Sequence, residues 1–407
     1  MKNRRLFYIA TDDEIKRGKT TDIYFRRTKQ ILEARDINRK VVAEISCGSL
    51  PKNWNFAVLC GIEEAMNLLE GYPVDVSALP EGTIFKPKDI NGVRNPIMNI
   101  KGNYKDFCEL ETPLLGLLCQ ATGISTSAAR IKMIAMDKQI LSFGVRRMHP
   151  AISPMIDRAS YIGGFDGVSA VLSAKMIKIK PQGTMPHALI IMFENPEDAW
   201  RAFDEIIPMN ISRIALCDTF SDEKMETINA AKTIKNLSAV RLDTPKSRRG
   251  NLKEIISEIR WELDIRGYND VKIFISGGVD EELITQLKDS PVDGFGIGTY
   301  VSNSPTVDMA MNIVEIDGKP ISKRGVFGGE KQLYKCFSCN EYLSIIDNIS
   351  KKSYKCPICN KKMRPLLKKV IRNGKIVAKL PDASEIRNSV LKELYGLNSA
   401  EFVINKR

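Results

Sequence analysis

Residues 271–302, VKIFISGGVDEELITQLKDSPVDGFGIGTYVS, contain two short apolar runs separated by a stretch with helical spacing. The runs at 271–278 and 293–301 are predicted as strands, and Asp280 is well placed to cap a helix between them. Each of the two strands carries glycines near its end. A strand, a helix and a second strand in this order require a right-handed crossover between parallel strands. The stretch therefore predicts a parallel sheet whose strand ends carry glycine-rich turns.

The same alternation of short apolar runs and helical segments extends over residues 140–310. Further strands are predicted at 187–193, 213–220 and 238–245, with helices at 223–236 and 251–267. The second helix has one apolar stripe, made by Leu252, Ile255, Ile256, Ile259 and Leu263. Several such units predict an irregular (β/α) barrel with its site at the carboxyl ends of the strands. An open, doubly wound sheet is the competing arrangement.

The rest of the chain divides into two further regions, so the fold class is α/β plus α+β. Residues 1–120 mix short β-rich runs with turns marked by Pro and Gly, which is typical of an α+β domain. A long helix is predicted at 109–136. The barrel is expected over 121–320. Residues 321–407 should form a small ribbon with four cysteines and a basic tail, which could pack back on the N-terminal domain.

The composition of the 407-residue chain, 43% hydrophobic and 27% charged, is that of a soluble globular protein. No run of 18 apolar residues occurs and the N-terminus turns polar too early for a signal peptide, so a cytoplasmic location without membrane contact is expected. Residues 319–407 carry 20 basic and seven acidic side chains, whereas the other 318 residues carry 41 and 42. This basic region could meet nucleic acid or simply form the solvated face of a small domain.

Four of the nine cysteines form two C-x2-C pairs separated by sixteen residues. They are Cys336, Cys339, Cys356 and Cys359. This spacing predicts tetrahedral thiolate ligation of Zn²⁺, with iron as a second choice of metal. Disulfides are the alternative, and they suit a cytosolic chain poorly. Because four thiolates saturate the ion, the site should be structural.

Polar residues and glycines follow four of the predicted strands. Asp218 and Asp243 end two of them, and the turns with Gly277 and Gly298 end the next two. Glycines at such turns let backbone N–H groups approach a phosphate, and paired carboxylates suit ribose hydroxyls or a diphosphate bound to Mg²⁺. Ordinary turn chemistry and helix capping are the simpler interpretations of the same residues.

Only two histidines occur in the chain, His149 and His187. His149 precedes a proline and is predicted to lie in a turn. His187 follows the Gly-Thr pair of GTMPH (183–187), and from the residues alone a structural role is the simpler interpretation.

Eight short motifs follow one another in an order that resembles one enzyme family. They are TDIYF (21–25), SFGVRR (142–147), GGFDGVS (163–169), GTMPH (183–187), CDTF (217–220), VRLDT (240–244), ISGG (275–278) and GIGT (296–299). The succession is similar to nicotinate phosphoribosyltransferases, with relatives among the nicotinamide and quinolinate enzymes of the type II phosphoribosyltransferase superfamily. It covers residues 10–320, and the four-cysteine ribbon resembles the archaeal branch.

The resemblance implies an activity for this chain. A 5-phosphoribosyl group would pass from phosphoribosyl pyrophosphate to the ring nitrogen of nicotinate, with Mg²⁺ as cofactor. ATP hydrolysis would be coupled through a phosphohistidine, and His187 would be that histidine. Asp218 and Asp243 would act beside it. An oxocarbenium-like centre forms as pyrophosphate leaves, so positioning and charge stabilisation should supply most of the acceleration.

The resemblance also implies the substrate contacts. Tyr24, supplied by a neighbouring subunit of a homodimer or larger oligomer, would stack on the pyridine ring, and Phe143 would cover its other face. The remaining binding residues would be Arg146 near the substrate carboxylate or phosphate, Asp166 in the pyridine pocket, Thr184 beside the histidine, Arg241 with the two aspartates on the ribose and pyrophosphate, and Ser276, Gly277, Gly278, Gly298 and Thr299 on the 5-phosphate.

One motif departs from the family pattern, and three alternatives stay open. The LDSGD found in many relatives is LDTPKSRRG here, which brings a basic loop with Lys246, Arg248 and Arg249. A quinolinate enzyme is the nearest rival, and an enzyme specific for nicotinamide is another. From a different class, the basic ribbon could make the protein a nucleic-acid-binding module on an inactive barrel. That function is disfavoured because the polar strand ends are all present.

Overall fold

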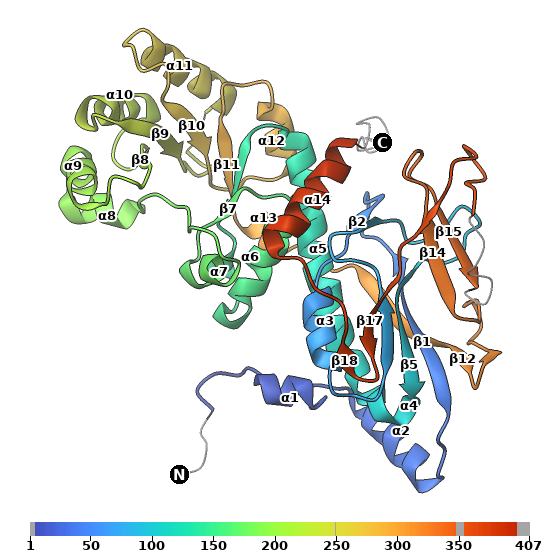
Figure 1. The fold of residues 1–407 in the computed structure, drawn as a ribbon. Coiled ribbons are helices and arrows are strands. Elements are labelled where there is room, and N and C mark those ends of the chain that lie inside the picture. The colour runs from blue at the N-terminus through green and yellow to red at the C-terminus, as the bar shows by residue number, and fades with distance from the viewer. Residues whose placement is uncertain (1–4, 249, 347–353, 397–407) are drawn as a thin grey trace. The chain divides into compact units, whose positions relative to one another are not determined.

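The computed structural model describes residues 5–248, 250–346 and 354–396 (Figure 1). The chain forms two compact units. The terminal unit combines Met1–Thr126 with Pro305–Arg407, and the central unit is Ser127–Ser304. Among the described residues, no helix has the length and apolar character needed to cross a membrane.

The central unit is built on six parallel strands. Their order is β7-β6-β11-β10-β9-β8. Their bounds are Gln139–Ser142 (β6), Gly167–Val168 (β7), Arg213–Leu216 (β8), Leu237–Leu242 (β9), Lys272–Ile275 (β10) and Gly294–Ile297 (β11). All neighbours pair in parallel, as the crossover argument requires. Among the described residues, β7 and β8 are the two edge strands and do not pair with each other. The sheet is therefore not closed into a barrel and forms a half-barrel.

Helices follow the strands of the central unit where the sequence predicts them. They are α10 (Glu223–Thr233), α11 (Leu252–Asp264) and α12 (Glu281–Leu287). In α11 the predicted stripe buries Ile256, Ile259 and Leu263. Asp280 caps α12, because its carboxylate accepts a hydrogen bond from the N–H of Leu283 at 2.8 Å. The unit also contains α6 (Ser153–Ile162), α7 (Val171–Met176), α9 (Pro196–Ile206) and the short α13 (Thr299–Ser302).

The prediction of a strand at 187–193 is wrong, since this stretch forms helix α8, His187–Phe193. The apolar run HALIIMF suggests a buried strand, but only Ile190 is buried, and Ile191, Met192 and Phe193 are exposed. A short apolar run cannot be assigned to strand or helix by periodicity alone. Pro186, in an extended conformation, directly precedes the helix, which ends at Glu194 with a left-handed φ of 59°. His187 is therefore the first residue of a helix.

The terminal unit contains a seven-stranded antiparallel sheet in the order β13-β12-β1-β5-β3-β17-β18. Its strands are β1 (Lys40–Ser49), β3 (Asp75–Ala78), β5 (Pro96–Asn103), β12 (Asp308–Ile316), β13 (Lys319–Pro320), β17 (Lys368–Arg372) and β18 (Lys375–Ile376). β1 pairs with β12, and β3 pairs with β17, so three strands from the N-terminal part of the chain lie between strands from the C-terminal part.

Helices and a second small sheet complete the terminal unit. The predicted long helix is α5, Glu111–Ala135, whose last residues belong to the central unit. The other elements are α1 (Asp12–Lys16), α2 (Ile23–Ala34), α3 (Ile62–Leu69), α4 (Tyr104–Phe107), α14 (Ala383–Gly396) and the strand pair β2 (Ala57–Val58) and β4 (Ile84–Phe85). One core joins residues of β1, α3 and β5 to Leu333 and Ile371 from the C-terminal region.

The ribbon consists of β14 (Lys331–Lys335), β15 (Tyr342–Ile346) and β16 (Arg364–Pro365), with β14 between the other two. Buried ion pairs join it to the rest of the terminal unit. Lys331 Nζ lies 2.9 Å from Glu44 of β1, and Lys335 pairs with Glu393 of α14. The hydroxyl of Tyr342 also donates to the carbonyl of Ile84. Part of the basic charge of the C-terminal region is thus neutralised within the unit.

Candidate active site

Four neighbouring parallel strands of the central unit end at one edge, which we call the rim. It comprises the residues after β8, β9, β10 and β11: Asp218 and Thr219, Asp243 and Thr244, Ser276 to Gly278, and Gly298 with Thr299. Carboxyl ends of parallel strands lie at the same edge of a sheet, so the predicted grouping of these residues follows from the topology.

Asp218 is the most buried carboxylate of the rim, with 2% of its side chain exposed. One carboxylate oxygen, Oδ2, accepts hydrogen bonds from the backbone N–H of Asp243 and from the hydroxyl of Thr244, the latter at 2.9 Å. The other oxygen, Oδ1, is buried without a hydrogen bond to any described residue. Burial raises the pKa of Asp218, although these hydrogen bonds oppose the rise. An acceptor atom is thus kept available at this edge.

His187 faces this acceptor from the start of α8. Its Nε2 lies 3.6 Å from Oδ1 of Asp218 and 3.9 Å from Oδ2 of Asp243. Its Nδ1 lies 3.1 Å from the hydroxyl of Thr219. The ring is 38% exposed, so a reactant can reach it. When an imidazole nitrogen forms a bond to an electrophile the ring gains positive charge, and two adjacent carboxylates stabilise that charge. The geometry therefore suits a nucleophilic histidine.

The turn after β10 packs directly against Asp243. The hydroxyl of Ser276 donates to Oδ1 of this carboxylate at 2.9 Å. Gly277 has a φ of +81°, and a Cβ atom there would come within 2.8 Å of the same oxygen. Gly278 has a φ of +67°, and its ideal Cβ would lie 3.7 Å from Cε of Lys246. The glycines are therefore required by a left-handed turn and by close packing on Asp243.

Arg241 holds the segment before His187 in place. Its guanidinium donates to the carbonyl of Met185 at 3.0 Å and lies 5.9 Å from the ring centre of Phe143. Its Nε is buried without a partner among the described residues. Burial lowers the pKa of Arg241, and the nearby charge of Arg146 adds to the effect. Thr184, adjacent to Met185, is partly buried. Two arginines and an aromatic ring thus gather at this part of the rim.

Phe143 occupies a position that glycines make available. A Cβ atom on Gly296 would lie 2.2 Å from the Phe143 ring, so the ring packs on the backbone of β11. The first glycine of GIGT therefore serves this contact. The second, Gly298, precedes the short helix α13, which begins at Thr299. The N–H of Phe143 donates to the carbonyl of Ile297 at 2.8 Å, which fixes the segment that leads to Arg146.

Asp166 does not join the rim, and its predicted place in the pyridine pocket stays a prediction. It directly precedes β7, so it lies on the amino side of that strand. Its carboxylate accepts the N–H of Ile140 at 2.8 Å and pairs with Lys132 at 3.0 Å. Phe165 and Asp166 lie in the loop that leads into β7 and not in the loop that follows this strand. The carboxylate joins α5 to β6 and is occupied by these contacts.

Tyr24 lies in the other unit, on α2, and is exposed. Its ring centre is 4.4 Å from that of Phe25. In the predicted basic loop, Lys246 and Arg248 are exposed, whereas Arg249 lies outside the described residues. His149 lies at a turn as predicted: its Nδ1 accepts the N–H of Ala151 and caps a short 3₁₀ helix, 150–152.

Two residues of α10 that the sequence analysis missed organise the rim. The carboxylate of Glu226 accepts the backbone N–H groups of Thr219, Phe220 and Ser221 at 2.9, 2.7 and 2.8 Å. Glu226 is 2% exposed. Glu223 Oε1 lies 2.7 Å from the hydroxyl of Thr244, so it shares the one hydrogen of this group with Asp218. Acidic residues in the first turns of a helix are usually interpreted as favourable to the helix dipole, so these two contacts were not predicted. The one indication in the sequence is that Glu226 lies next to the residues that form the buried face of α10.

The four cysteines of the ribbon converge. Their sulfur atoms all lie within 4.8 Å of one another, with 3.4 Å between Cys336 and Cys359 and between Cys339 and Cys356. Zn–S bonds of about 2.3 Å in a tetrahedron place sulfurs about 3.8 Å apart, so the donor set fits Zn²⁺. Each C-x2-C pair is followed by an asparagine with a φ of 58°, and these left-handed residues let both turns fold back on the metal position.

The chain is similar to known phosphoribosyltransferases over most of its length. The family model "Quinolinate phosphoribosyl transferase, N-terminal domain" matches residues 22–122, and its C-terminal domain matches 124–312. A crystal structure of nicotinate-nucleotide pyrophosphorylase from Pyrococcus furiosus is 54% identical, with a TM-score of 0.92 over 97% of this chain and 99% of that chain. The chain belongs to the family of nicotinate and quinolinate phosphoribosyltransferases.

A further family match covers the C-terminal region of the chain. The model "Nicotinate phosphoribosyltransferase C-terminal domain" matches residues 331–402. A nicotinate phosphoribosyltransferase of Mycobacterium tuberculosis H37Rv is 27% identical over 77% of this chain and 74% of its own length. The human nicotinic acid phosphoribosyltransferase shares the fold, with a TM-score of 0.73 over 94% of this chain and 95% of that chain at 19% identity.

Proposed function

We propose that the protein is a nicotinate phosphoribosyltransferase, which makes nicotinate mononucleotide and pyrophosphate from nicotinate and phosphoribosyl pyrophosphate. The observation that carries the proposal is the rim, where His187 faces the carboxylates of Asp218 and Asp243. The match of a nicotinate-type C-terminal domain to residues 331–402 favours nicotinate over quinolinate as the substrate. Small-molecule substrates accord with the family.

In the proposed transfer, the bond from the anomeric carbon to pyrophosphate breaks with its electron pair on the leaving oxygen. The pyridine nitrogen of nicotinate then supplies the pair that forms the new bond. The positive charge that develops on the ribose between these events would be stabilised by Asp243 and Asp218. Ser276 and the Gly277 turn, which pack on Asp243, would hold the 5-phosphate near its backbone N–H groups, with Gly278, Gly298 and Thr299.

Mg²⁺ would neutralise the leaving pyrophosphate. It usually binds through one or two protein carboxylates and substrate phosphates. Asp218 Oδ1, buried and without a hydrogen bond to a described residue, and the neighbouring Asp243 fit that donor set. Among the residues that the structure describes, only the four cysteines form a larger cluster of metal-ligating groups. Substrate oxygens would therefore complete the magnesium site.

His187 would couple ATP hydrolysis to the transfer. Its imidazole nitrogen would attack the γ-phosphorus of ATP, ADP would leave with the electron pair of the broken P–O bond, and water would later release phosphate. Thr219 beside Nδ1 and the two carboxylates near Nε2 support this role, because they orient the ring and balance its charge. Thr184 would lie next to the transferred phosphoryl group.

The nicotinate ring would lie against Phe143, with Arg146 and Arg241 near its carboxylate or the substrate phosphates. Tyr24 of a second subunit would cover the other face, which makes a homodimer the smallest active assembly. The exposure of Tyr24 supports this proposal. The basic residues of the ribbon are partly paired with Glu44 and Glu393, which disfavours nucleic-acid binding as the main function.

A turnover assay tests the proposal. The purified protein is incubated with phosphoribosyl pyrophosphate, Mg²⁺ and either nicotinate, nicotinamide or quinolinate, with and without ATP, and the mononucleotide and pyrophosphate are measured. Turnover of nicotinate in preference to the other two is expected. Quinolinate turnover with release of carbon dioxide would assign the protein to the sister activity, and no turnover of any substrate would refute the proposal.

A further inference from the structure

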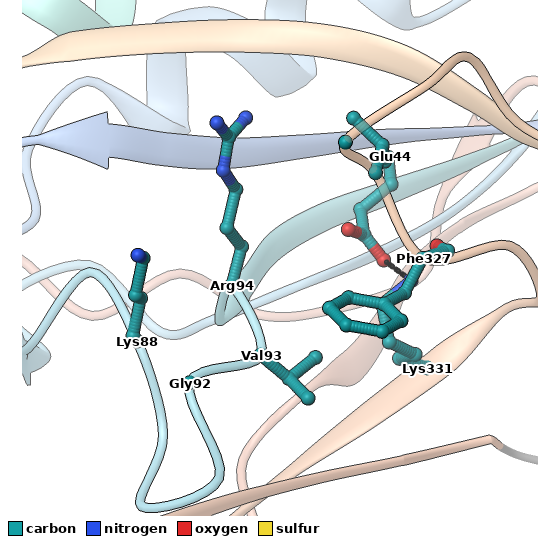
Figure 2. Close-up of a pocket in the computed structure, with 9 residues that line it drawn as sticks. Glu44, Lys88, Gly92, Val93, Arg94, Phe327 and Lys331 are labelled. Atoms are coloured by element: carbon teal, nitrogen blue, oxygen red, sulfur yellow. Dashed lines mark hydrogen bonds and ion pairs between the residues drawn. The ribbon is translucent and has the colours of Figure 1, made fainter.

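A cavity of about 220 Å³ in the terminal unit has a strongly basic lining (Figure 2). The charged residues around it are Glu44, Lys88, Arg94 and Lys331, and Val93 and Phe327 contribute apolar walls. The cavity belongs to the terminal unit, whereas the rim belongs to the central unit. Three cations against one carboxylate leave the lining with a net positive charge.

The carboxylate in the wall is already neutralised. Glu44 is 1% exposed, and Lys331 is 4% exposed. Their side chains pair at 2.9 Å, and Lys331 also donates to the carbonyls of Phe327 and Gly329 at 2.9 and 3.1 Å. The ammonium of Lys331 is therefore surrounded by one carboxylate oxygen and two carbonyl oxygens. The unbalanced positive charge resides on Lys88 and Arg94.

Lys88 and Arg94 are held next to each other by a rigid turn. They pair across an antiparallel bridge, and Figure 2 shows both side chains extending in the same direction from that turn. Asp89 fixes the turn, because one of its oxygens accepts the N–H groups of Asn91 and Val93, both at 2.9 Å. Its other oxygen accepts the N–H of Ser344 in the ribbon.

This arrangement carries an electrostatic cost in the absence of a ligand. Like charges placed opposite each other on paired strands are destabilising. Neither the Lys88 ammonium nor the Arg94 guanidinium has a hydrogen bond or ion pair with a residue that the structure describes. An anion between them would offset the repulsion and satisfy the donors of both groups.

We propose that this cavity binds a small phosphate-type oxyanion, with inorganic phosphate and pyrophosphate as the two sources of that chemistry. Arg94 contacts two oxygens with its planar donor fork, and Lys88 contributes a point charge. The cavity is smaller than the roughly 300 Å³ at which pockets for larger organic ligands begin, so a nucleotide does not fit inside it. Phe327, 62% exposed, covers one side of the bound ion.

Calorimetric titration of the full-length protein with phosphate, and separately with pyrophosphate, tests the site. The rim is expected to bind these ions too, so every titration uses a chain with Arg241→Ala, which weakens ion binding at the rim. In this background one ion per chain should still bind. Lys88→Ala with Arg94→Ala should weaken that binding by at least about tenfold, because each lost charged hydrogen bond contributes about 1.5 kcal/mol or more.

The matched control removes two arginines from exposed helical ion pairs, Arg17→Ala with Arg266→Ala, and should leave the affinity unchanged within about twofold. As a second readout, also in the Arg241→Ala background, phosphate should raise the melting temperature more than chloride does at equal ionic strength, and Lys88→Gln with Arg94→Gln should remove this difference. Equal binding by the cavity variant and the control, or equal shifts with both salts, would overturn the site. Neither result depends on turnover, so the proposed activity stands or fails separately.

Discussion

The guanidinium of Arg241, at the end of β9, donates a hydrogen bond of 3.0 Å to the carbonyl of Met185, two residues before His187. This bond joins a strand end of the rim to the segment that positions the histidine. The histidine then reaches Asp218 and Asp243 from α8, an element that is not part of the sheet. Arg241 and the two carboxylates that face His187 therefore belong to one connected group of side chains.

Replacing His187 with alanine should abolish the gain in turnover that ATP brings while leaving slow nicotinate turnover without ATP. In the proposed mechanism the ring is the nucleophile for the phosphoryl group, and the transfer to nicotinate does not need it. Mononucleotide formation is measured with and without ATP, with His149→Ala as the control because that histidine caps a distant turn. An ATP effect that survives in His187→Ala would remove the histidine from the mechanism.

Arg241→Lys should raise KM for phosphoribosyl pyrophosphate by about tenfold. Lysine keeps the charge but lacks the planar donor group that contacts Met185 and lies over Phe143. Initial rates over a range of substrate concentrations give KM and kcat. Arg201→Lys, at an exposed ion pair, is the control. An unchanged KM would show that charge alone suffices at this position.

Glu226→Gln should reduce both stability and activity. The amide offers one acceptor oxygen in place of a charged carboxylate with two, so at least one of the three N–H groups of residues 219–221 loses its partner. A loss of about 1.5–3 kcal/mol in the free energy of unfolding is expected. Denaturant titration measures it, and kcat should fall because Thr219 shifts relative to His187. The control is Glu258→Gln at an exposed ion pair; equal stability of the two variants would contradict the anchoring role.

The terminal unit should hold one zinc ion per chain. Metal analysis of Cys356→Ser should show the loss of this ion. Removal of the metal with a chelator should lower the melting temperature, because the site exists only in the folded chain and the free energy of metal binding therefore adds to folding stability. Elemental analysis and a thermal melt measure both effects. Cys60→Ser is the control, because this buried cysteine lies outside the cluster. Full zinc content in Cys356→Ser would exclude the proposed ligand set.

Stability should depend on pH through Glu111, at the start of α5. Burial raises the pKa of this carboxyl to about 7, against the lowering effect of Lys323. A group with a raised folded-state pKa favours the folded state below its unfolded value near 4.5, and this contribution disappears as pH rises towards 7. Glu111→Gln should therefore gain stability relative to wild type at pH 8 but not at pH 4. Thermal melts at both values test this, with Glu258→Gln as the control, and a pH-independent difference would contradict it.

Much of the central unit could be predicted from sequence, because its strands and helices alternate with clear spacing and glycine-marked ends. Asp218, Asp243, Ser276 and Gly277 followed from that pattern, since parallel strands place their ends together. The segment 187–193 could not be assigned, because a seven-residue apolar run fits either a strand or a helix. The contacts of Asp166 with Ile140 and Lys132 could not be predicted either, because the residues alone do not indicate the two-residue strand β7 that follows it.

Other features depend on contacts between segments that are distant in the sequence. Glu226 is identified only once the loop after β8 folds back over α10. The pairing of β17 with β3 and the opposition of Lys88 and Arg94 likewise need the three-dimensional arrangement. No local pattern in the sequence encodes these partners, whereas the spacing of the cysteines alone predicts the four-cysteine cluster.

The position of the early strands of the terminal sheet, between late strands on both sides, sets an order for biosynthesis. The central unit is one continuous segment, so all of it is available once residue 304 has left the ribosome. The sheet of the terminal unit cannot be completed until β17 and β18 emerge, nearly at the end of translation. Until then β3 exposes an unpaired edge to other chains. The sheet that contains the N-terminal strands is therefore the last to be completed, although those strands are made first.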